Sequence, residues 1–378
     1  MRVCYFGTYR DEYTRNQILI AGLRAQGVTV LECHATLWQG VADRVALAGG
    51  GWRSRRFWGR VARAYGQLWR RYRELPEYDV MVVGYPGQID VNFGRILTWL
   101  RRKPLVLDIL MSIHLVAEER GLTAQSPFTG RLLFHLERWG LRLPDRLIME
   151  NTAYRQYISH KYRLPVARFR TLPHGANDTL YTPRPSRQTS DTFRVVYFGS
   201  FLPSHGMPTI MGAAERLRDR PNIEFHLYGD GPEKAACLAQ AQAAGLTRVI
   251  FHGFVEQDTL LQGIADAGVC LGVFGATPQA LMTVQNKVWE TLAMGRPLIS
   301  ADSPAIREAL EDQTHLVLVP RQDPDALAAA LLALLAQPAE REAMAQRGHQ
   351  YFLEHNATQA LGARFKAVLE EVVAESRG

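Results

Sequence analysis

Two side chains in the second half of the chain have types and a spacing that suit phosphate and sugar binding. Lys287 and Glu290 stand three residues apart in the segment NKVWETLAMGRPLI, so on a helix they share one face. Lys287 falls in the expected first turn, where unpaired backbone N–H groups and the helix dipole favour an anion. A carboxylate one turn further along can accept hydrogen bonds from a vicinal diol such as that of ribose. The pair predicts a nucleotide-diphosphate site, although the same spacing also fits an ordinary surface ion pair.

The elements that must position these side chains alternate regularly. Apolar, β-rich runs are expected as strands at 193–199, 223–229, 249–253, 268–274, 296–301 and 315–320, and helical patterns separate them. Strands that alternate with helices of this length indicate βαβ units and a parallel sheet with helices on both faces. We therefore expect a doubly wound, Rossmann-like domain over residues 193–355.

The first half repeats this alternation and predicts a second domain of the same kind over residues 1–184. Its strands are expected at 2–7, 28–34, 79–85, 104–110, 145–150 and 169–175. The polar segment 185–192 is the expected linker, and a helix over 356–378 could cross back to the N-terminal domain. The fold class is α/β, with two facing doubly wound parallel-sheet domains. Ligands are expected at the carboxyl ends of the strands, in the cleft between the domains.

Length and composition are those of an ordinary globular protein. The chain has 378 residues, of which 47% are hydrophobic and 21% are charged. No secretory leader and no apolar run of the ~18–20 residues that span a bilayer are visible, so a cytoplasmic location is expected. The four cysteines, at positions 4, 33, 237 and 270, are scattered, and no disulfide framework or metal-ligand spacing is apparent. They are expected to be core thiols.

Charge is distributed unevenly between the halves. Residues 1–184 contain 28 Lys and Arg and 15 Asp and Glu, a net charge of +13, whereas residues 185–378 have a net charge of −6. The segment 52–75 alone holds eight arginines and one acid, with apolar residues at helical spacing. Such a basic amphipathic helix can lie on an anionic membrane surface, with Trp52, Trp58 and Trp69 at the interface, or it can simply pack on the sheet with solvated arginines. Nucleic acid is not an expected partner, because no recognised binding module accompanies the basic run.

Five segments together resemble a known family. They are YFGSFLPSHGMPTIMGAAERL (197–217), HLYGDGPEK (226–234), FHGFVEQDTLLQGIADAGVCL (251–271), NKVWETLAMGRPLI (286–299) and PHGANDTLYTP (173–183). In these segments the chain resembles retaining glycosyltransferases with the GT-B fold, of the group 1 type also called family four. The resemblance covers nearly the whole chain and is most specific in its second half.

The resemblance implies roles for particular positions. Glu290 matches the family's second motif glutamate, which binds ribose hydroxyls, whereas the first motif glutamate is replaced here by Met282. The lysine that often precedes the glycine after the first donor-domain strand is replaced by His205, which makes Lys287 the main expected phosphate cation and His205 a secondary one. The implied donor-binding residues are Gly7, Thr8, Gly199, Ser200, His205, Gly229, Phe254, Asn286, Lys287 and Glu290.

The first half supplies weaker candidates for the acceptor side. Gly7 and Thr8 end the first strand, where the backbone could approach the donor phosphates. Asp108 lies near the end of the strand expected at 104–110 and His114 follows that strand, and the family often places a histidine near this position. Asp108, His114 and Lys287 are therefore the candidate catalytic residues, although a lone histidine is also common as a structural residue.

The function implied by the resemblance is transfer of a sugar, with retention of configuration, from a nucleotide-diphosphate sugar to a glycan or lipid-linked acceptor. No cofactor and no metal are expected, because cations and backbone N–H groups can stabilise the leaving diphosphate. Two alternatives remain at this stage. One is a sugar-nucleotide epimerase or hydrolase of similar fold, and the other is a non-catalytic subunit that binds a nucleotide sugar, which the replacement of a motif glutamate by Met282 would suit.

Overall fold

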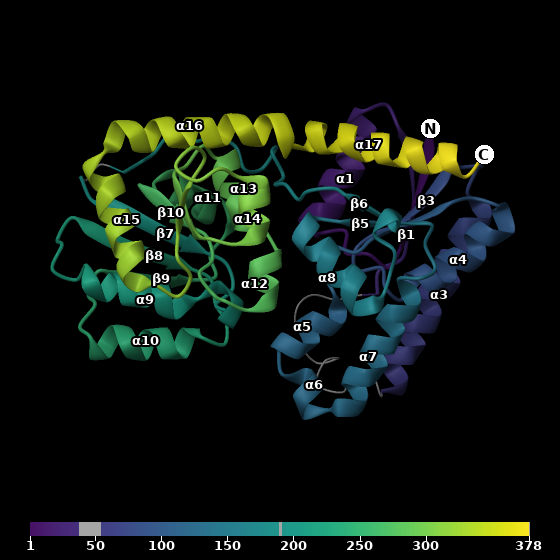
Figure 1. Ribbon diagram of the computed structural model, residues 1–378, viewed down its shortest axis with the longest axis horizontal. Helices are drawn as coiled ribbons and strands as arrows, with labels where there is room; N and C mark the ends of the chain where they lie inside the picture. The colour runs from purple at the N-terminus through teal and green to yellow at the C-terminus, as the bar shows by residue number, and fades with distance from the viewer. Residues whose placement is uncertain (38–53, 189–190, 378) are drawn as a thin grey trace. The chain divides into compact units, whose positions relative to one another are not determined.

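The computed structural model describes residues 1–37, 54–188 and 191–377. The chain forms two compact units, each with its own parallel sheet (Figure 1). The first unit comprises Met1–Pro173 together with Thr358–Gly378, and the second comprises His174–Ala357. Pro185 to Gln188, at the start of the segment predicted as a linker, belong to the second unit.

The sheet of the first unit has six parallel strands in the order β2-β1-β3-β4-β5-β6. The strands are β1 (Arg2–Gly7), β2 (Thr29–His34), β3 (Val80–Val83), β4 (Leu105–Asp108), β5 (Arg146–Met149) and β6 (Phe169–Thr171). The central strands β3 and β4 are buried along their whole length, as expected where helices cover both faces of a parallel sheet. The six strands predicted for this half are therefore confirmed.

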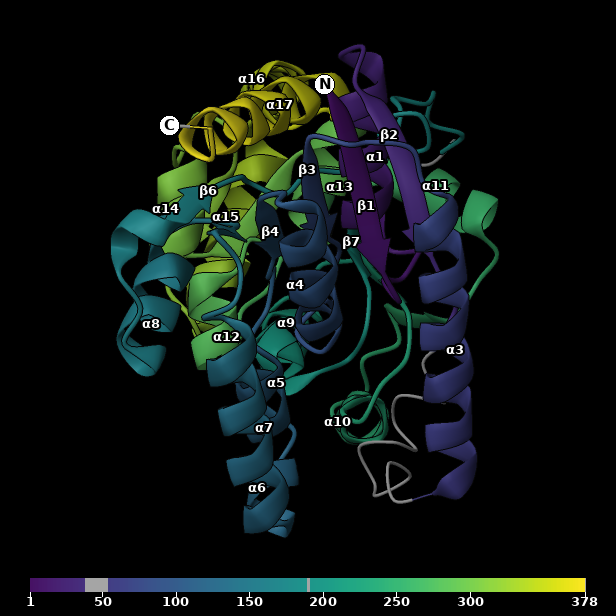
Figure 2. The ribbon, with the colours of Figure 1, turned by 90° about the vertical axis from the view of Figure 1, so that its right-hand side faces the viewer.

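Eight α-helices are described in the first unit. They are α1 (Thr14–Ala25), α3 (Arg55–Glu74), α4 (Asp90–Arg101), α5 (Ile113–Glu119), α6 (Leu122–Gln125), α7 (Pro127–Gly140), α8 (Thr152–Tyr162) and α17 (Thr358–Glu375). The last of these, α17, contributes Leu361, Phe365 and Leu369 to the same apolar core as α1. The two helices approach closely where glycines meet, because a Cβ added to Gly362 would lie 2.2 Å from the carbonyl oxygen of Gly22. In Figure 2, α4 lies near the centre, α7 below it and α3 to the right.

The sheet of the second unit also has six parallel strands, in the order β12-β11-β10-β7-β8-β9. The strands are β7 (Phe193–Phe198), β8 (Ile223–Tyr228), β9 (Val249–Gly253), β10 (Val269–Leu271), β11 (Leu298–Ala301) and β12 (Val317–Val319). The switch of direction in this order lies between β7 and β10, at the point where doubly wound sheets bind ligands. The α/β fold class with two doubly wound parallel sheets is confirmed.

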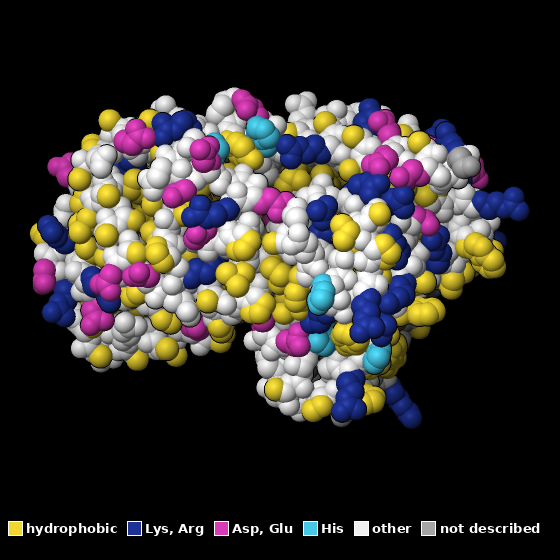
Figure 3. Space-filling model, in the orientation of Figure 1, with side chains coloured by type: hydrophobic (Ala, Val, Ile, Leu, Met, Phe, Trp, Pro, Cys, Tyr) yellow, Lys and Arg dark blue, Asp and Glu magenta, His cyan; other side chains and the backbone are white. Residues whose placement is uncertain are grey.

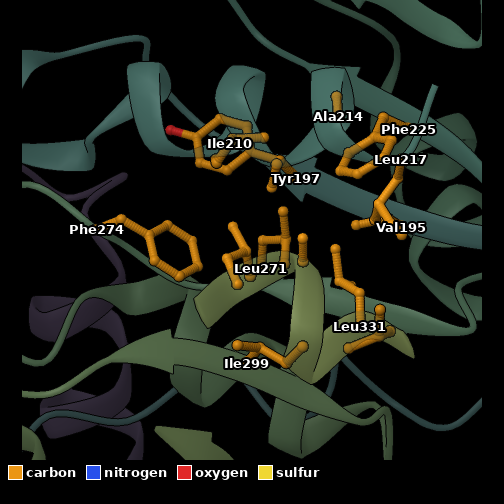
Figure 4. Close-up of a cluster of buried hydrophobic side chains, with 14 of the residues drawn as sticks. Val195, Tyr197, Ile210, Ala214, Leu217, Phe225, Leu271, Phe274, Ile299 and Leu331 are labelled. Atoms are coloured by element: carbon orange, nitrogen blue, oxygen red, sulfur yellow. The ribbon is translucent and has the colours of Figure 1, made fainter. Parts of the chain in front are cut away.

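The side chains of β7 show why helices cover both faces of this sheet. Val195 and Tyr197 point into one apolar cluster with α9 (Met207–Arg216) and α15 (Pro324–Ala336), as Figure 4 shows. Val196 and Phe198 point into the opposite cluster, which α11 (Gln257–Ala265), α13 (Asn286–Ala293) and α16 (Pro338–His355) complete. The remaining helices of this unit are α10 (Lys234–Ala243), α12 (Pro278–Met282) and α14 (Pro304–Ala309).

Neither a membrane span nor a metal centre is found among the described residues. Over the described ranges, no helix is long and apolar enough to cross a membrane. Over the same ranges, no group of three or more His, Cys, Asp and Glu side chains could hold a metal ion. All four cysteines are free and buried, as predicted for core thiols.

Candidate functional site

The helix α13 places Lys287 and Glu290 on one buried face at the carboxyl edge of the second sheet. Every side chain from Lys287 to Ala293 is buried, including those of the charged residues Lys287 and Glu290. Gln285 precedes the helix, and no side chain caps its first N–H groups. The positive end of the helix dipole is therefore left without a capping oxygen from a side chain, which is favourable for an anion.

Lys287 is a buried cation held by uncharged groups. Its side chain is 5% exposed, and its Nζ atom lies 3.9 Å from the ring centroid of Tyr197 and 3.4 Å from Nδ1 of His205. It forms no ion pair with any carboxylate in the described part of the chain. Burial lowers the pKa of Lys287 to about 7, against the opposing effect of the Glu290 charge. A bound anion would supply the countercharge that the protein itself does not place beside this ammonium group.

The strand ends on either side of Lys287 consist of glycines that allow close approach. Gly199 follows β7 with a φ of +128°, and an added Cβ would lie 3.0 Å from the Nζ of Lys287. Gly229 follows β8 with a φ of +126°, and its added Cβ would lie 2.0 Å from the carbonyl oxygen of Gly199. Both positions therefore require glycine, for the backbone conformation and for space. The structure brings the predicted residues Gly199, Ser200, His205, Gly229 and Lys287 together at this edge.

His205 is neutral in this arrangement. Burial and the neighbouring Lys287 charge lower the pKa of His205 to about 3. The Tyr197 hydroxyl lies 2.7 Å from the His205 Nδ1 and donates to the carbonyl oxygen of Ser200 at 2.8 Å. His205 therefore contributes a polar, uncharged ring next to Lys287, and the positive charge that the sequence suggested for it is absent at neutral pH.

Glu290 is bonded to a tyrosine that the sequence pattern did not single out. The carboxylate is 9% exposed and accepts a hydrogen bond from the Tyr181 hydroxyl. Burial raises the pKa of Glu290 to about 7, while Lys287 and Tyr181 act in the opposite direction. Tyr181 lies in the segment PHGANDTLYTP, which resembles the family. That segment alone does not reveal that Tyr181 bonds to Glu290, more than a hundred residues away.

The loop around Met282 is fixed by an arginine that the sequence pattern also did not reveal. The guanidinium of Arg321 donates to the carbonyl oxygens of Gly275, Ala280 and Asp302, at 3.1 Å for Ala280 and 2.6 Å for Asp302. Thr277 caps α12, which ends at Met282. Met282, which stands where the family has its first motif glutamate, therefore lies at the end of a segment whose backbone carbonyl groups are held by Arg321.

The other predicted residues of the second unit occupy distinct places. Asn286 is half-buried and begins α13. Phe254 follows β9 and is 82% exposed, so its ring is available to a ligand but packs on none of the residues above. An Asp-Pro-Asp sequence at 323–325 forms a helix start, in which Asp323 caps the Ala326 N–H and Asp325 binds Arg216.

In the first unit, the loop at Gly7 and Thr8 already has an anionic partner. The Asp90 carboxylate accepts hydrogen bonds from the Thr8 N–H at 2.6 Å and from the Thr8 hydroxyl at 2.9 Å. A Cβ on Gly7 would lie 2.7 Å from the same oxygen, and Tyr65 donates to the other carboxylate oxygen at 2.7 Å. The Thr8 N–H that the sequence assigned to phosphate is therefore occupied by Asp90.

Asp108 lies at the end of β4 and is fully buried. The Arg15 guanidinium binds it through two hydrogen bonds, of 2.7 and 2.8 Å, and also donates to the carbonyl oxygens of Leu172 and Pro173. This bidentate pair joins α1 to β4 and to the end of β6. Its geometry is that of a structural ion pair, since no surface of Asp108 is left for a substrate.

His114 lies in the first turn of α5, and its Nδ1 is 3.1 Å from the Glu118 carboxylate. Burial and the Lys161 charge lower the pKa of His114, so the ring is neutral at neutral pH. The start of α5 is held by the buried carboxylate of Glu137, which accepts from Ser112 Oγ at 2.7 Å and from the His114 N–H at 3.1 Å. His114 is thus a neutral imidazole on a rigidly positioned helix start.

Two doubly wound parallel-sheet domains are the architecture of the GT-B class of fold, and solved structures agree. Sucrose-phosphate synthase from Thermosynechococcus elongatus matches with a TM-score of 0.72, at 17% identity, over 99% of each chain. HepE from Anabaena in complex with UDP matches with a TM-score of 0.71, at 15% identity, over 98% of this chain and 100% of that one.

Sequence comparisons match part of the chain to a known family. Residues 192–337 match the model of the family Glycosyl transferases group 1. Alpha-D-kanosaminyltransferase from Streptomyces kanamyceticus is 25% identical over 71% of each chain. Phosphatidyl-myo-inositol mannosyltransferase from Mycolicibacterium smegmatis is 30% identical over 37% of this chain and 36% of its own length. Residues 192–337 thus match the group 1 glycosyltransferase family, as the resemblance in the sequence indicated, and the whole chain shares the GT-B fold of these solved structures.

Proposed function

We propose that the protein is a metal-independent, retaining glycosyltransferase that moves a sugar from a nucleotide-diphosphate donor to a glycan or lipid-linked acceptor. The observation that carries the donor part is Lys287, a buried ammonium group without a carboxylate partner among the described residues, at the uncapped start of a helix. A diphosphate fits this place because it supplies two negative charges to a cation and a helix dipole.

The chemistry follows from the charge that develops on the leaving group. As the bond between sugar and diphosphate breaks, negative charge grows on the phosphate oxygens, and a preorganised cation stabilises it without rearrangement. Lys287 supplies this charge, and Glu290 is placed one turn further along the same face to accept hydrogen bonds from ribose hydroxyls. Since a lysine can take the role that a divalent ion plays in other transferases, the proposed reaction needs no metal.

Retention of configuration and a glycan or lipid-linked acceptor are the parts of the proposal that come from the family resemblance. In such a reaction the leaving phosphate takes the acceptor proton, so no protein nucleophile is required. HepE structures contain UDP and UDP-glucose, which makes uridine nucleotides the first ligands to test.

Association with an anionic membrane surface is the second component of the proposal. The helix α3 buries Ala64, Leu68 and Tyr72 against the first sheet and exposes its arginines, Trp58 and Trp69. Trp52, the third tryptophan named for this role, lies outside the described residues. The exposed arginines give α3 an electrostatic attraction to anionic headgroups.

A ligand screen followed by one substitution tests the donor site. UDP, GDP, ADP and their sugars are added to the protein, and the rise in unfolding temperature identifies the preferred nucleotide. Lys287→Met should then abolish most of that rise, whereas Arg248→Met, which removes an exposed cation of the same unit, should preserve it. Equal rises in both variants would contradict the assigned site. Hydrolysis or epimerisation of the donor without transfer would favour an epimerase or hydrolase, and binding without any turnover would favour a non-catalytic subunit.

A further inference from the structure

Two neighbouring helices of the first unit expose apolar stripes instead of burying them. We call these side chains the α4/α7 face: Ile89, Ile96, Trp99, Leu100, Phe128, Leu132, Leu136 and Trp139. The first four precede or belong to α4, and the last four belong to α7. Trp99 is 77% exposed and Trp139 is 61% exposed. Single exposed apolar residues are common on protein surfaces, whereas a group of large ones marks an interaction surface.

The spacing shows that each stripe is a regular helix face. On α4, Ile96, Trp99 and Leu100 stand at i, i+3 and i+4, while Val91 and Leu97 on the opposite side are buried. On α7, the exposed apolar residues recur every three or four positions from Phe128 to Trp139. A helix that is apolar on two sides normally has both sides covered.

The two stripes belong to one surface, because α4 and the end of α7 are packed together. A Cβ added to Gly140 would lie 2.8 Å from the carbonyl oxygen of Gln88, just before α4. The Arg95 guanidinium donates to the Leu143 carbonyl oxygen at 2.8 Å and binds Asp145 at 2.7 Å. In Figure 2, α7 lies below α4, and α3 lies apart from both, at the right.

The two helices of this surface expose arginines and no carboxylate. The acidic residues of α4 and α7 are Asp90 and Glu137, and both are buried in the hydrogen bonds described above. Among the described residues, Arg102, Arg131 and Arg138 form no ion pair. Figure 3 shows Lys and Arg side chains among hydrophobic ones on the part of the first unit that carries α7. An exposed apolar surface with arginines and no exposed carboxylate on its helices complements an anionic lipid surface.

A pocket adjoins this surface at the C-terminal end of α4. It has a volume of about 590 Å³, and its lining includes Trp99 and Arg102. Lys103 and Asp145 also line it, and they already bind Glu77 and Arg95 respectively. Cations beside an exposed tryptophan are the combination that suits a lipid phosphate at the boundary between headgroups and acyl chains. A second copy of the chain would instead bring two surfaces of the same positive sign together, which disfavours self-association.

We infer that the α4/α7 face docks on an anionic membrane surface, with its apolar side chains in the interfacial region and its arginines at the lipid phosphates. The inference rests on the membrane component of the proposed function and moves the apolar contact from the tryptophans of α3 to those of α4 and α7. It does not depend on the nucleotide site, which lies in the other unit.

Vesicle co-sedimentation tests this with two matched double variants. One variant is Trp99→Ser with Trp139→Ser, and the control is Trp58→Ser with Trp69→Ser, which removes two exposed tryptophans from α3. Vesicles of phosphatidylglycerol and phosphatidylcholine should bind the wild-type chain, and the face variant should bind about tenfold less, because two interfacial side chains are lost. The control should retain most of the binding. An equal loss in both variants, or a loss in the control alone, would overturn the inference while leaving membrane association intact.

Further measurements make the result independent of folding defects. Lipids brominated along their acyl chains should quench the tryptophan fluorescence of the wild type and of the α3 control, and absence of quenching in the control would count against the α4/α7 face. If none of the three proteins bound vesicles and light scattering showed a dimer that the face variant dissociates, the surface would be a dimer interface and the inference would be wrong. A nucleotide-induced rise in unfolding temperature, measured in the same samples, reports separately on the donor site.

Discussion

The ammonium nitrogen of Lys287 lies over the ring of Tyr197, 3.9 Å from its centroid. An aromatic face stabilises a cation without neutralising it, and His205 next to it is uncharged. A carboxylate at the same distance would compete with a bound phosphate, whereas a tyrosine ring and a neutral imidazole do not. This arrangement costs stability in the free protein, because a buried charge lacks a counterion.

Donor affinity should fall as the pH rises above about 7. In the free protein burial lowers the pKa of Lys287 to about 7, whereas a bound diphosphate holds the proton on. Binding therefore takes up a proton above that pH, and the dissociation constant should increase toward about tenfold per pH unit. Titration calorimetry with a nucleotide sugar, in two buffers of different ionisation enthalpy, measures both the dissociation constant and the number of protons taken up on binding.

Glu290 titrates in the same range, so the pH experiment needs a control. Glu290→Gln removes that carboxylate while keeping its size, and the decrease in affinity above about pH 7 should remain in this variant. An affinity that stayed constant from about pH 7 to about pH 9 in both proteins would show that Lys287 does not supply the charge for the phosphates.

Tyr181→Phe should weaken nucleotide binding through Glu290. The Tyr181 hydroxyl lowers the pKa of that carboxylate, so its loss leaves a larger fraction protonated at neutral pH, where the carboxyl accepts ribose hydroxyls less well. A several-fold increase in the dissociation constant at about pH 7 is expected, and it should shrink at higher pH as Glu290 ionises. If Tyr181 acts through Glu290, the double variant with Glu290→Gln should bind no worse than Glu290→Gln alone. Additive losses would indicate a separate role.

Gly199→Ala should reduce both stability and nucleotide binding. The backbone at φ +128° disfavours a side chain, and the added methyl group would reach to 3.0 Å from the Lys287 ammonium nitrogen. A loss of about 1–3 kcal/mol in the free energy of unfolding is expected from strain. Gly245→Ala is the matched control, because Gly245 has a φ of +62° and open space around its Cα. Denaturant unfolding and nucleotide titration of both variants should show that only Gly199→Ala affects the ligand.

Asp108→Asn should destabilise the first unit. Breaking a fully buried, bidentate pair leaves the Arg15 charge uncompensated, which costs about 3–5 kcal/mol of unfolding free energy. Glu340→Gln, which breaks the exposed pair with Arg347, should cost less than about 1 kcal/mol. A catalytic Asp108 would give the opposite pattern, with normal stability and lost turnover. Urea unfolding and sugar-transfer assays on the same preparations distinguish a structural role of Asp108 from a catalytic one.

The sequence was sufficient for the fold because parallel strands covered on both faces are nearly continuous apolar runs. All twelve strands lie where such runs were found, from RVCYFG at β1 to HLVLVP at β12. The proximity of Lys287 to the glycine turn at Gly199 could also be anticipated, since parallel strands place their carboxyl ends at one edge.

Side-chain partners far apart in the sequence could not be anticipated. Asp108 was interpreted as catalytic because it ends a strand, but Arg15, 93 residues away, neutralises it. Thr8 was assigned to phosphate, and its N–H donates to Asp90, 82 residues away. The periodicity of α3 was clear from the sequence, whereas the exposure of the apolar stripes of α4 and α7 depends on their packing. Such pairings depend on which helix faces meet, and local spacing does not encode that.

The docking of α17 on α1 has a consequence for the order in which the chain acquires its structure. A ribosome releases Gly22 before the second unit and Gly362 after it, so the core of the first unit stays partly open until the second unit, which is continuous in sequence, has been synthesised. The residues of α17, including Phe365 and Leu369, then close the core to which α1 contributes. Removal of α17 should therefore expose the apolar side of α1 and yield a chain whose second half folds while its first half aggregates.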